Sequence, residues 1–504
     1  MMSIVALRPP MSLEQIVNLH GNHLVAWNLD QFAAIVLKGE DKQKLVKLAE
    51  ENKAKFGPYI VFYLPGKLFS IKLGATYETV VYDLGQYFPN DLEEPENIQV
   101  YADKLATAIT AMNLESTKTL VSPIGIYKSV VLPHVKLPSW DMPREAMMYA
   151  MDCAGRAWIE AFQVGKWEKA WDYDLKGAYP HVAANLYATD QLNWIKSPIC
   201  ETDAIYGYAK GRVIIDKDIP LHPIMKRTDP ENTRDDNAVW HSPVGTWHTT
   251  LTKGEIDFII EHGIGEFHIT DGWWAFERLN FNTQKPLMKI IPDILRWKKD
   301  ACPVVRTIAK GISVGMYGIF GAVVKDTYGP HFNPCWFAEI PTQTRLQVAE
   351  FIYKHKLQSN LIHVSTDGVL LDSPVELDLE DRTRFEWALD YEGPSLVLGS
   401  MHRWLPRLHT MGITMDEIGT EFKKFPNNGS YFFNTKLQAS IGQCVQWGEF
   451  SHQGEQTDYI TEVNLATIPQ KRNFPDYPNT GEEVLRKIYR SKARHEAIPI
   501  IDLP

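Results

Sequence analysis

Apolar and polar positions alternate in four short stretches of the first 135 or so residues, and this spacing predicts strands. The stretches are "NHLVAW", "YIVFYL", "LFSIKL" and "TVVYDL", and "KQKLVKLAEENKAKF" between them has the spacing of a helix. Prolines then interrupt "VVLPHVKLPSWDMPRE", which is typical of a linker. We therefore expect an α/β unit that ends near residue 140.

After the linker, the pattern predicts a helix over "EAMMYAMDCAGRAWIEAF", a strand in "KAWDYDL", and a turn and helix in "KGAYPHVAANLYA". Residues 195–285 are aromatic and strand-rich with many turn signals, as expected of an inserted subdomain. Helices are predicted in "PLMKIIPDILRWKKD", in "PVVRTIAKGISVGMYGIFGAV" from Pro303, and in "TQTRLQVAEFIYKHK". A hairpin over "LIHVSTDGVLLDS" and basic C-terminal helices complete an α+β multidomain chain.

Length and composition predict a multidomain protein of three or four compact units, since the chain has 504 residues of which 44% are hydrophobic. No apolar run approaches the roughly 18 residues that span a bilayer, and the N-terminus does not resemble a secretion leader. We therefore expect a cytoplasmic protein with no membrane partner. The 5 cysteines are scattered and never spaced as C-x-x-C, which argues against disulfides and structural zinc.

The net charge of −10 would by itself count against a nucleic-acid partner, because phosphate contacts require lysine and arginine. The basic residues are unevenly placed, however, and gather in "LRWKKD…VVRTIAK", in "KKF" and in "LRKIYRSKARH". Each of these runs also fits a solvated helix face. Charge therefore leaves a local nucleic-acid track open.

Two carboxylates stand at the ends of predicted strands. Asp367 lies in the hairpin turn, where Gly368 would supply the permissive backbone, and Asp174 ends the strand in "WDYDLKGAYP". An Asp in a tight turn is commonly structural, but converging carboxylates from adjacent strands can hold two magnesium ions about 3.5–4 Å apart. Asp172 and Asp174 equally fit the D-x-D metal site of a nucleotide-sugar glycosyltransferase.

The helix from Pro303 carries a cationic face. The helical spacing places Arg306, Lys310, Val314 and Tyr317 on one side. Gly311, Gly315 and Gly318 are expected beside them. Such a face can hold a triphosphate at its cationic end and stack a base at its small, flat end. A solvated amphipathic helix is the alternative interpretation.

In this order, three stretches resemble the motifs of family B DNA polymerases, closest to the protein-primed branch of viruses and linear plasmids. "DYDLKGAYP" resembles D-x-x-S-L-Y-P, "KGISVGMYG" resembles K-x-x-x-N-S-x-Y-G, and "VSTDGV" resembles the D-T-D-S hairpin. About 130 residues separate the first two. "DCAGRAWIEAFQVGKWEKAWDYDL" is similar to the Y-x-G-G-R segment and "FNPCWFAEIPTQTR" to the segment before the hairpin, so the resemblance covers roughly residues 140–425.

The resemblance implies a right-hand polymerase with palm, fingers and thumb that extends DNA by two-metal phosphoryl transfer. Catalysis would fall to Asp174 and Asp367, and these two with the Leu175 backbone would bind two Mg²⁺, for which Mn²⁺ can substitute. The implied nucleotide-binding residues are Lys298, Arg306, Lys310, Tyr179, Tyr317 and Gly318, with Tyr179 as the gate that excludes a 2′-hydroxyl. The implied DNA-binding residues are Gly155, Arg156, Thr366, His402, Arg403 and Trp404.

The implied partners are primer-template DNA, deoxynucleoside triphosphates, and a priming protein or replication accessory proteins. The implied parts are an exonuclease-like domain (1–140), palm (141–230 and 326–400), an insertion contacting the priming protein (231–285), fingers (286–325), and thumb with basic tail (401–504). Fewer than 50 residues separate Gly318 from Asp367, which leaves no room for the loop that encircles template in this branch. Weak strand displacement is the expected consequence.

Several positions depart from the family pattern. Ser365 replaces the first Asp of D-T-D, Gly368 its Ser, Val314 the fingers Asn, and Gly177 the Ser of the first motif. Arg403 is expected to replace the lysine that holds primer phosphate. Because both essential aspartates are kept, activity is expected, while a non-catalytic polymerase-derived nucleic-acid-binding protein stays an alternative.

The N-terminal unit resembles the end of a proofreading exonuclease of ribonuclease-H-like α/β fold. "VAWNLDQFAAI" is similar to its second motif, "TVVYDLGQYFPNDL" to the strand that follows, and "VYADKLATAI" to its third. About 27 residues precede Asn28, and none of them is expected to form the strand with the first motif, D-x-E. We therefore expect a relic that does not proofread.

Overall fold

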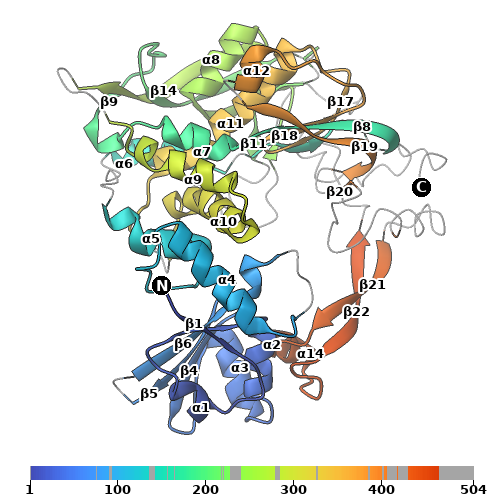
Figure 1. Ribbon diagram of the computed structural model, residues 1–504. Helices are drawn as coiled ribbons and strands as arrows, with labels where there is room; N and C mark the ends of the chain where they lie inside the picture. Colours follow the sequence, from blue (N-terminus) through green and yellow to red (C-terminus); the bar gives the residue numbers. More distant parts are fainter. Residues whose placement is uncertain are drawn as a thin grey trace. The chain divides into compact units, whose positions relative to one another are not determined.

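The computed structural model describes the chain except for the following residues: 1, 75–76, 90–93, 135–141, 156, 164, 217, 220, 228–239, 279–283, 325–326, 384–385, 400–401, 406–416, 418–429 and 465–504. The chain forms two compact units (Figure 1). The first unit comprises residues 1–136, 292–316 and 434–460, and the second comprises residues 137–291, 317–433 and 461–504. The basic run "LRKIYRSKARH" lies outside the described residues.

A six-stranded sheet forms the centre of the first unit, in the order β1-β2-β6-β5-β4-β3. Strands β1, β2 and β6 are parallel, and the others pair antiparallel. The strands are β1 (Ile4–Leu7), β2 (His23–Ala26), β3 (Lys53–Phe56), β4 (Tyr59–Leu64), β5 (Leu68–Leu73) and β6 (Tyr77–Asp83). The helices are α1 (Leu13–Val17), α2 (Leu29–Val36), α3 (Lys42–Glu51), α4 (Ile98–Ala111) and α5 (Pro123–Val130).

The structure differs from the predicted elements of this unit in two places. The helix predicted over "KQKLVKLAEENKAKF" ends at Glu51, because Asn52 adopts the left-handed conformation (φ 59°) that terminates helices, and Lys53–Phe56 is a strand. A strand also exists upstream of Asn28, since β1 pairs in parallel with β2. Its sequence, "IVAL", contains no carboxylate, so it does not supply a D-x-E motif.

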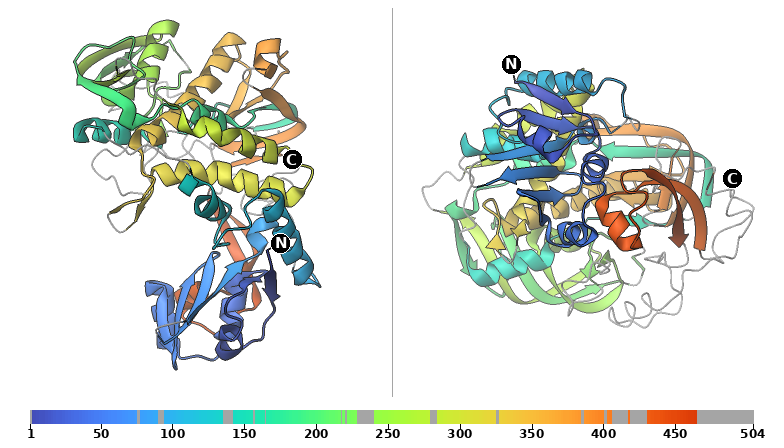
Figure 2. Two further views of the ribbon diagram at one scale, coloured as in Figure 1. Left: turned by 60° about the vertical axis from the view of Figure 1, so that its left-hand side comes forward. Right: turned by 90° about the horizontal axis from the view of Figure 1, so that it is seen from below.

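Later segments of the chain complete the first unit. Helix α9 (Ile291–Lys298) and most of α10 (Pro303–Phe320) belong to it, as does α14 (Ile441–Trp447). Helix α14 packs against α3 and α2 (Figures 1 and 2). The Gln453 side chain donates to the Ala34 carbonyl at 2.8 Å. Residues far apart in sequence therefore share one core.

Gly311 and Gly315 of α10 allow close helix packing within this unit. A Cβ at Gly311 would meet Pro123 at 2.7 Å, and one at Gly315 would meet Ile124 at 2.7 Å. These two glycines therefore pack against α5 and do not flank the cationic face as expected. A Cβ at Gly318, in contrast to these two glycines, would meet no atom within 4 Å.

The second unit contains an antiparallel six-stranded sheet in the order β20-β19-β8-β18-β17-β7 (Figure 1). Its strands are β7 (Ile159–Ala161), β8 (Gly165–Leu175), β17 (Leu361–Ser365), β18 (Gly368–Leu371), β19 (Trp387–Gly399) and β20 (His402–Trp404). Helix α7 (Ala178–Ala184) follows β8 directly, and α6 (Arg144–Cys153) precedes β7. Strand β8 is central, with β18 on one side and β19 on the other.

A four-stranded antiparallel sheet, β13-β10-β14-β9, forms the aromatic part of this unit. The strands are β9 (Leu192–Lys196), β10 (Tyr206–Ile215), β13 (Gly245–Thr252) and β14 (Gly265–Glu277), and α8 (Lys253–His262) packs on them. The long helix α11 (Pro334–Lys354) contacts α6, α7 and α8. One hydrophobic core joins both sheets through side chains such as Tyr173, Trp247, Trp274 and Phe351.

Most sequence-based elements of this unit are confirmed, including the strand-rich region, the helix before the hairpin, and the hairpin itself. The helix predicted over residues 145–162 is wrong at its end. It stops at Cys153, and Ile159–Ala161 instead pairs with β17. Within the described part of the chain, no helix is both long and apolar enough to cross a membrane.

Candidate active site

Strand β8 sends its side chains alternately to two sides. Tyr173 and Leu175 lie in the hydrophobic core of the second unit, and both are almost fully buried. Asp172 and Asp174 therefore point to the opposite side of the sheet. The buried apolar side chains fix the register of β8, so the two carboxylates are held in place near the end of this strand.

The hairpin β17–β18 brings Asp367 to the end of β8. Gly368 lies opposite Asp174 in the sheet register, and the Leu175 N–H donates to the Asp367 carbonyl at 2.8 Å. Thr366 has a φ of 60°, which is unfavourable for a β-branched residue, and its N–H donates to the Trp158 carbonyl at 2.7 Å. Asp174 and Asp367 therefore occupy the joined ends of neighbouring strands.

Gly368 does not supply the permissive turn backbone, contrary to expectation, because Thr366 takes the positive φ. A Cβ at position 368 would lie 3.0 Å from the Tyr173 carbonyl and 3.6 Å from the Asp174 carboxylate. Glycine here therefore allows close approach of β18 to β8 beside Asp174.

Lys176 contacts the carboxylate of Asp174. Its Nζ lies 3.0 Å from Asp174 Oδ2 and also forms a short ion pair with Asp390 of β19. Burial lowers the pKa of Lys176, but hydrogen bonds and charge interactions with Asp390 and Asp174 outweigh this effect, so the pKa is raised overall. The ammonium group therefore stays charged at neutral pH.

Asp172 forms a separate ion pair with Arg403. Arg403 Nη2 donates to Asp172 Oδ2 at 2.9 Å, and both side chains are mostly buried. Burial raises the pKa of Asp172 to about 6, although the Arg403 charge opposes this. Because Asp172 is engaged by Arg403, the geometry disfavours a D-x-D site in which both carboxylates bind one metal.

Tyr179 lies in the first turn of α7, beside an aromatic group. Its ring lies edge-on to Tyr317, with centroids 5.3 Å apart, and Tyr317 stacks on Phe337 at 4.7 Å. Burial and the negative charge of Asp367 raise the pKa of Tyr179 to about 12, so the phenol is neutral. Gly177 supplies the turn into α7 with a φ of 66°, a conformation that glycine adopts readily and serine does not.

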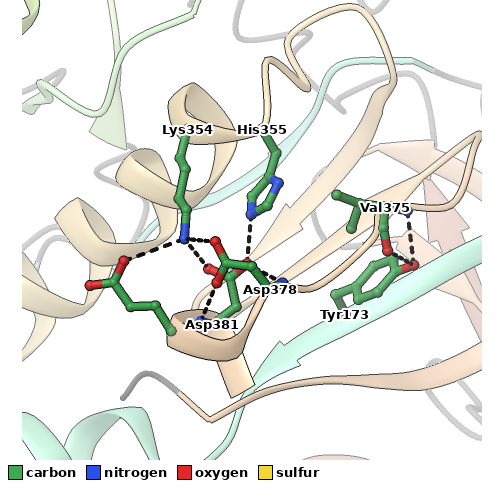
Figure 3. Close-up of polar contacts among 7 residues, drawn as sticks. Tyr173, Lys354, His355, Val375, Asp378 and Asp381 are labelled. Carbon is green, nitrogen blue, oxygen red and sulfur yellow. Dashed lines mark hydrogen bonds and ion pairs between the residues drawn. The ribbon is translucent and has the colours of Figure 1, made fainter. Parts of the chain in front are cut away.

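The opposite side of β8 is anchored by the Tyr173 hydroxyl (Figure 3). The hydroxyl donates to the Val375 carbonyl at 3.1 Å and accepts from the Val375 N–H at 3.0 Å. Nearby, Lys354 and His355 at the end of α11 both contact buried Asp381, each at 2.8 Å (Figure 3). These contacts fix the connection between β18 and β19.

The second unit brings together most of the residues that sequence reasoning assigned to the site. Asp174, Leu175 and Asp367 lie at the same end of the sheet, where β8 meets the β17–β18 hairpin. The Gly155 backbone hydrogen-bonds to the Tyr317 hydroxyl. Gly318 is exposed beside Tyr317 on α10, and Thr366 precedes Asp367. Trp404 of β20 is fully buried, so its indole supports the sheet.

The three predicted phosphate-binding cations belong to the first unit, where Lys298 lies on α9 and Arg306 and Lys310 lie on α10. Arg306, Lys310 and Val314 are exposed, as the helical spacing predicts. Arg306 donates to the carbonyls of Asp300 and Ala301 at 2.6 and 2.9 Å. Arg156 and the side chain of His402 lie outside the described residues.

The donor set at Asp174 and Asp367 fits magnesium. Magnesium in phosphoryl-transfer sites takes one or two carboxylates and completes its coordination with water and substrate phosphate oxygens. Among residues with a described placement, no group of three or more His, Cys, Asp or Glu side chains could hold a metal. Two carboxylates with a backbone carbonyl at Leu175 suit an ion that is shared with a substrate.

Sequence reasoning missed the partners of these carboxylates. Lys176 was visible directly after "DYDL", but Asp390 lies more than 200 residues away. Only the antiparallel pairing of β19 with β8 brings it near. The pairing of Asp172 with Arg403 depends on the same sheet.

In sequence, no protein-family model and no curated protein matches the chain. In structure, it is similar to Phi29 DNA polymerase in complex with primer-template DNA and incoming nucleotide, with a TM-score of 0.59 at 13% identity over 90% of this chain and 92% of that chain. The Phi29 binary complex with primer-template DNA gives a TM-score of 0.56 at 12% identity over 90% and 93% of the chains. The Phi29 complex with single-stranded DNA gives 0.52 at 12% identity over 78% and 79%. The chain therefore has the fold of Phi29 DNA polymerase across nearly its whole length.

Proposed function

We propose that this chain is a template-directed DNA polymerase that adds deoxynucleotides to a 3′-hydroxyl. The observation that carries the proposal is the position of Asp174 and Asp367 on paired strands, in a fold shared with Phi29 DNA polymerase over 90% of the chain. The fold alone would not specify chemistry. The argument for polymerase chemistry therefore comes from the two carboxylates at this end of the sheet.

Asp174, Asp367 and the Leu175 carbonyl would hold two Mg²⁺, and Mn²⁺ could substitute. When bound, the ions would stabilise negative charge on the attacking and leaving oxygens of phosphoryl transfer. The protein's own contribution is to hold both carboxylates on a rigid sheet, through the backbone hydrogen bond from Leu175 to Asp367. The pairing of Asp172 with Arg403 keeps that third carboxylate apart.

Tyr179 would discriminate against ribonucleotides. Its neutral, mostly buried ring is fixed against Tyr317, so it could not easily move aside for a 2′-hydroxyl. Tyr317 and Gly318 would line the nascent base pair, and Lys298, Arg306 and Lys310 would bind the triphosphate. Gly155, Arg156, Thr366 and His402 would contact DNA, with Trp404 supporting strand β20 from the interior. Arg403 would contact DNA only if its mostly buried side chain left the ion pair with Asp172.

The palm would comprise residues 141–230 and 326–400, with the insertion at residues 231–285. Residues 286–325, with α9 and α10, would form the fingers, and residues 401–504 would form the thumb and basic tail. Two of the cited Phi29 structures contain primer-template DNA and one contains incoming nucleotide, which supports the same partners here. A priming protein or accessory proteins, in a virus, plasmid or other mobile element, would complete the replication system.

Residues 1–140 would form an exonuclease relic without proofreading activity. Strand β1 has no carboxylate. The Asp30 carboxylate accepts hydrogen bonds from the Tyr63 hydroxyl at 2.6 Å and the Gly66 N–H at 2.7 Å. Burial raises the pKa of Asp83 to about 7, which weakens it as a metal ligand at neutral pH. These features suit a scaffold better than a hydrolytic site.

Primer extension by the purified protein tests the proposal. A labelled primer on a longer template should lengthen with deoxynucleotides and Mg²⁺ and should stay unchanged when the metal is chelated. Binding of the primer-template without extension, under Mg²⁺ and Mn²⁺ alike, would favour a non-catalytic nucleic-acid-binding protein instead.

A further inference from the structure

The ammonium group of Lys176 forms an ion pair with Asp174, one of the two carboxylates of the proposed metal site. Lys176 Nζ lies 3.0 Å from Asp174 Oδ2, two residues further along the chain. The same nitrogen also forms a short ion pair with Asp390. Lys176 therefore bridges two carboxylates, one of which, Asp174, lies opposite Gly368 beside Asp367.

A β-bulge brings Asp390 to this position. In the register of β19 with β8, Leu389 lies opposite Tyr173 and Tyr391 lies opposite Asp172, so Asp390 is an extra residue between them. Bulges redirect a side chain and are common next to active sites. Here the bulge places a second carboxylate within reach of Lys176.

An ammonium ion and Mg²⁺ cannot both occupy the same carboxylate oxygen without repulsion between the two cations. We infer that Lys176 is a positioning residue that competes with the metal for Asp174, and that Asp390 receives its ammonium group when Asp174 binds metal. The inference rests on the proposed metal site. It adds a determinant of metal affinity outside the two catalytic carboxylates.

The exposure of these groups sets the size of the effect. The side chains of Lys176, Asp174 and Asp390 are 39%, 29% and 43% exposed, so solvent screens their interactions. Pairs of this kind change equilibria by about two- to fivefold. Removing Lys176 should therefore tighten metal binding by about two- to fivefold, and removing the charge of Asp390 should weaken it by a similar factor.

Manganese(II) binding to the full chain without DNA or nucleotide, measured by electron paramagnetic resonance of the free ion, tests the inference directly. Lys176→Met should bind Mn²⁺ more tightly than wild type, and Asp390→Asn should bind it more weakly. In the double variant, Asp390→Asn should weaken binding less than it does in wild type, because Lys176 is gone. Lys169→Met is a matched control, since Lys169 of β8 pairs with Glu392 of β19 at 2.6 Å but lies five residues from Asp174.

The opposite signs of the two single variants separate competition from simple misfolding, which would weaken binding in both. Unchanged Mn²⁺ affinity in Lys176→Met and Asp390→Asn, with weaker binding in Asp174→Asn, would overturn the competition and leave the metal site intact. Equal binding by wild type and Asp174→Asn would instead overturn the proposed metal site, and the competition with it.

Discussion

The backbone N–H of Leu175 donates to the backbone carbonyl of Asp367 at 2.8 Å, and this bond joins the end of β8 to the tip of the β17–β18 hairpin. The carboxylates of Asp174 and Asp367 are therefore carried by backbone that is already hydrogen-bonded. Side-chain substitution at either aspartate leaves this bond in place. Loss of function in such variants can then be separated from loss of structure.

Replacement of Tyr179 tests the proposed sugar gate. Tyr179→Ala should raise incorporation of ribonucleotides relative to deoxynucleotides by about tenfold, or roughly 1.4 kcal/mol, because discrimination by clash is lost with the ring. Tyr179→Phe keeps the ring against Tyr317 and should retain the preference. Equal use of both sugars by wild type would contradict a gate at this position.

A mismatched primer tests the absence of proofreading. Incubated with Mg²⁺ and no nucleotides, a 3′-mismatched primer should stay full length, because β1 carries no carboxylate and Asp30 is engaged by Tyr63 and Gly66. Denaturing gels would detect shortening of the primer. Asp103 is the carboxylate in "VYADKLATAI", the segment similar to the third exonuclease motif. Shortening that disappears in Asp30→Ala or Asp103→Ala would mean that residues 1–140 form an active exonuclease.

Strand displacement should be weak without a helicase or single-strand-binding protein. Between Gly318 and Asp367, the described residues form the short pair β15 (Val323–Val324) and β16 (Thr327–Tyr328), then α11 and β17. Little chain is left to encircle a template. Extension on gapped duplexes should stop near the downstream strand, and kilobase products from the protein alone would refute this prediction.

Stability should depend on pH through Glu339. Burial raises the pKa of this carboxyl to about 7 in the folded chain from an ordinary value of 4.5, so the folded state retains a proton that the unfolded state loses. Its contribution to stability is therefore complete below pH 4.5 and is lost as the pH rises to about 7, by at most about 3 kcal/mol.

Glu339→Gln isolates this contribution. Urea titrations give the unfolding free energy of wild type and of Glu339→Gln. The unfolding free energy of wild type should fall relative to that of Glu339→Gln between pH 4.5 and about 7, and the difference should level off above this interval. A difference that is constant from pH 4.5 to 7.5 would show that Glu339 titrates normally.

Local patterns predicted the strands that carry Asp174 and Asp367 well, because alternation and turn residues can be recognised in contiguous sequence. The hairpin around Asp367 and the strand ending at Asp174 are both present as expected. The positive φ was assigned to Gly368 but belongs to Thr366, since tertiary contacts with Trp158 and the close approach to Tyr173 decide it.

Contacts between distant segments were beyond sequence reasoning. The ion pair of Asp172 with Arg403 and the bulge at Asp390 both follow from the register of β19 on β8, which no local pattern encodes. Likewise, the helical spacing of Gly311 and Gly315 shows that they share one face, but either a ligand or a neighbouring helix could pack against that face. Only the structure identifies α5 as their partner.

Template-directed single-nucleotide incorporation by wild type and Asp367→Asn is the most direct measurement of the central claim. With Mg²⁺ and a primed template, wild type should add the nucleotide complementary to the template base. Asp367→Asn should lower the rate by about a thousandfold or more, corresponding to roughly 4 kcal/mol of lost transition-state stabilisation, while circular dichroism and primer-template affinity stay near wild type. Incorporation by Asp367→Asn at the wild-type rate would contradict the assignment of this site as the polymerase centre.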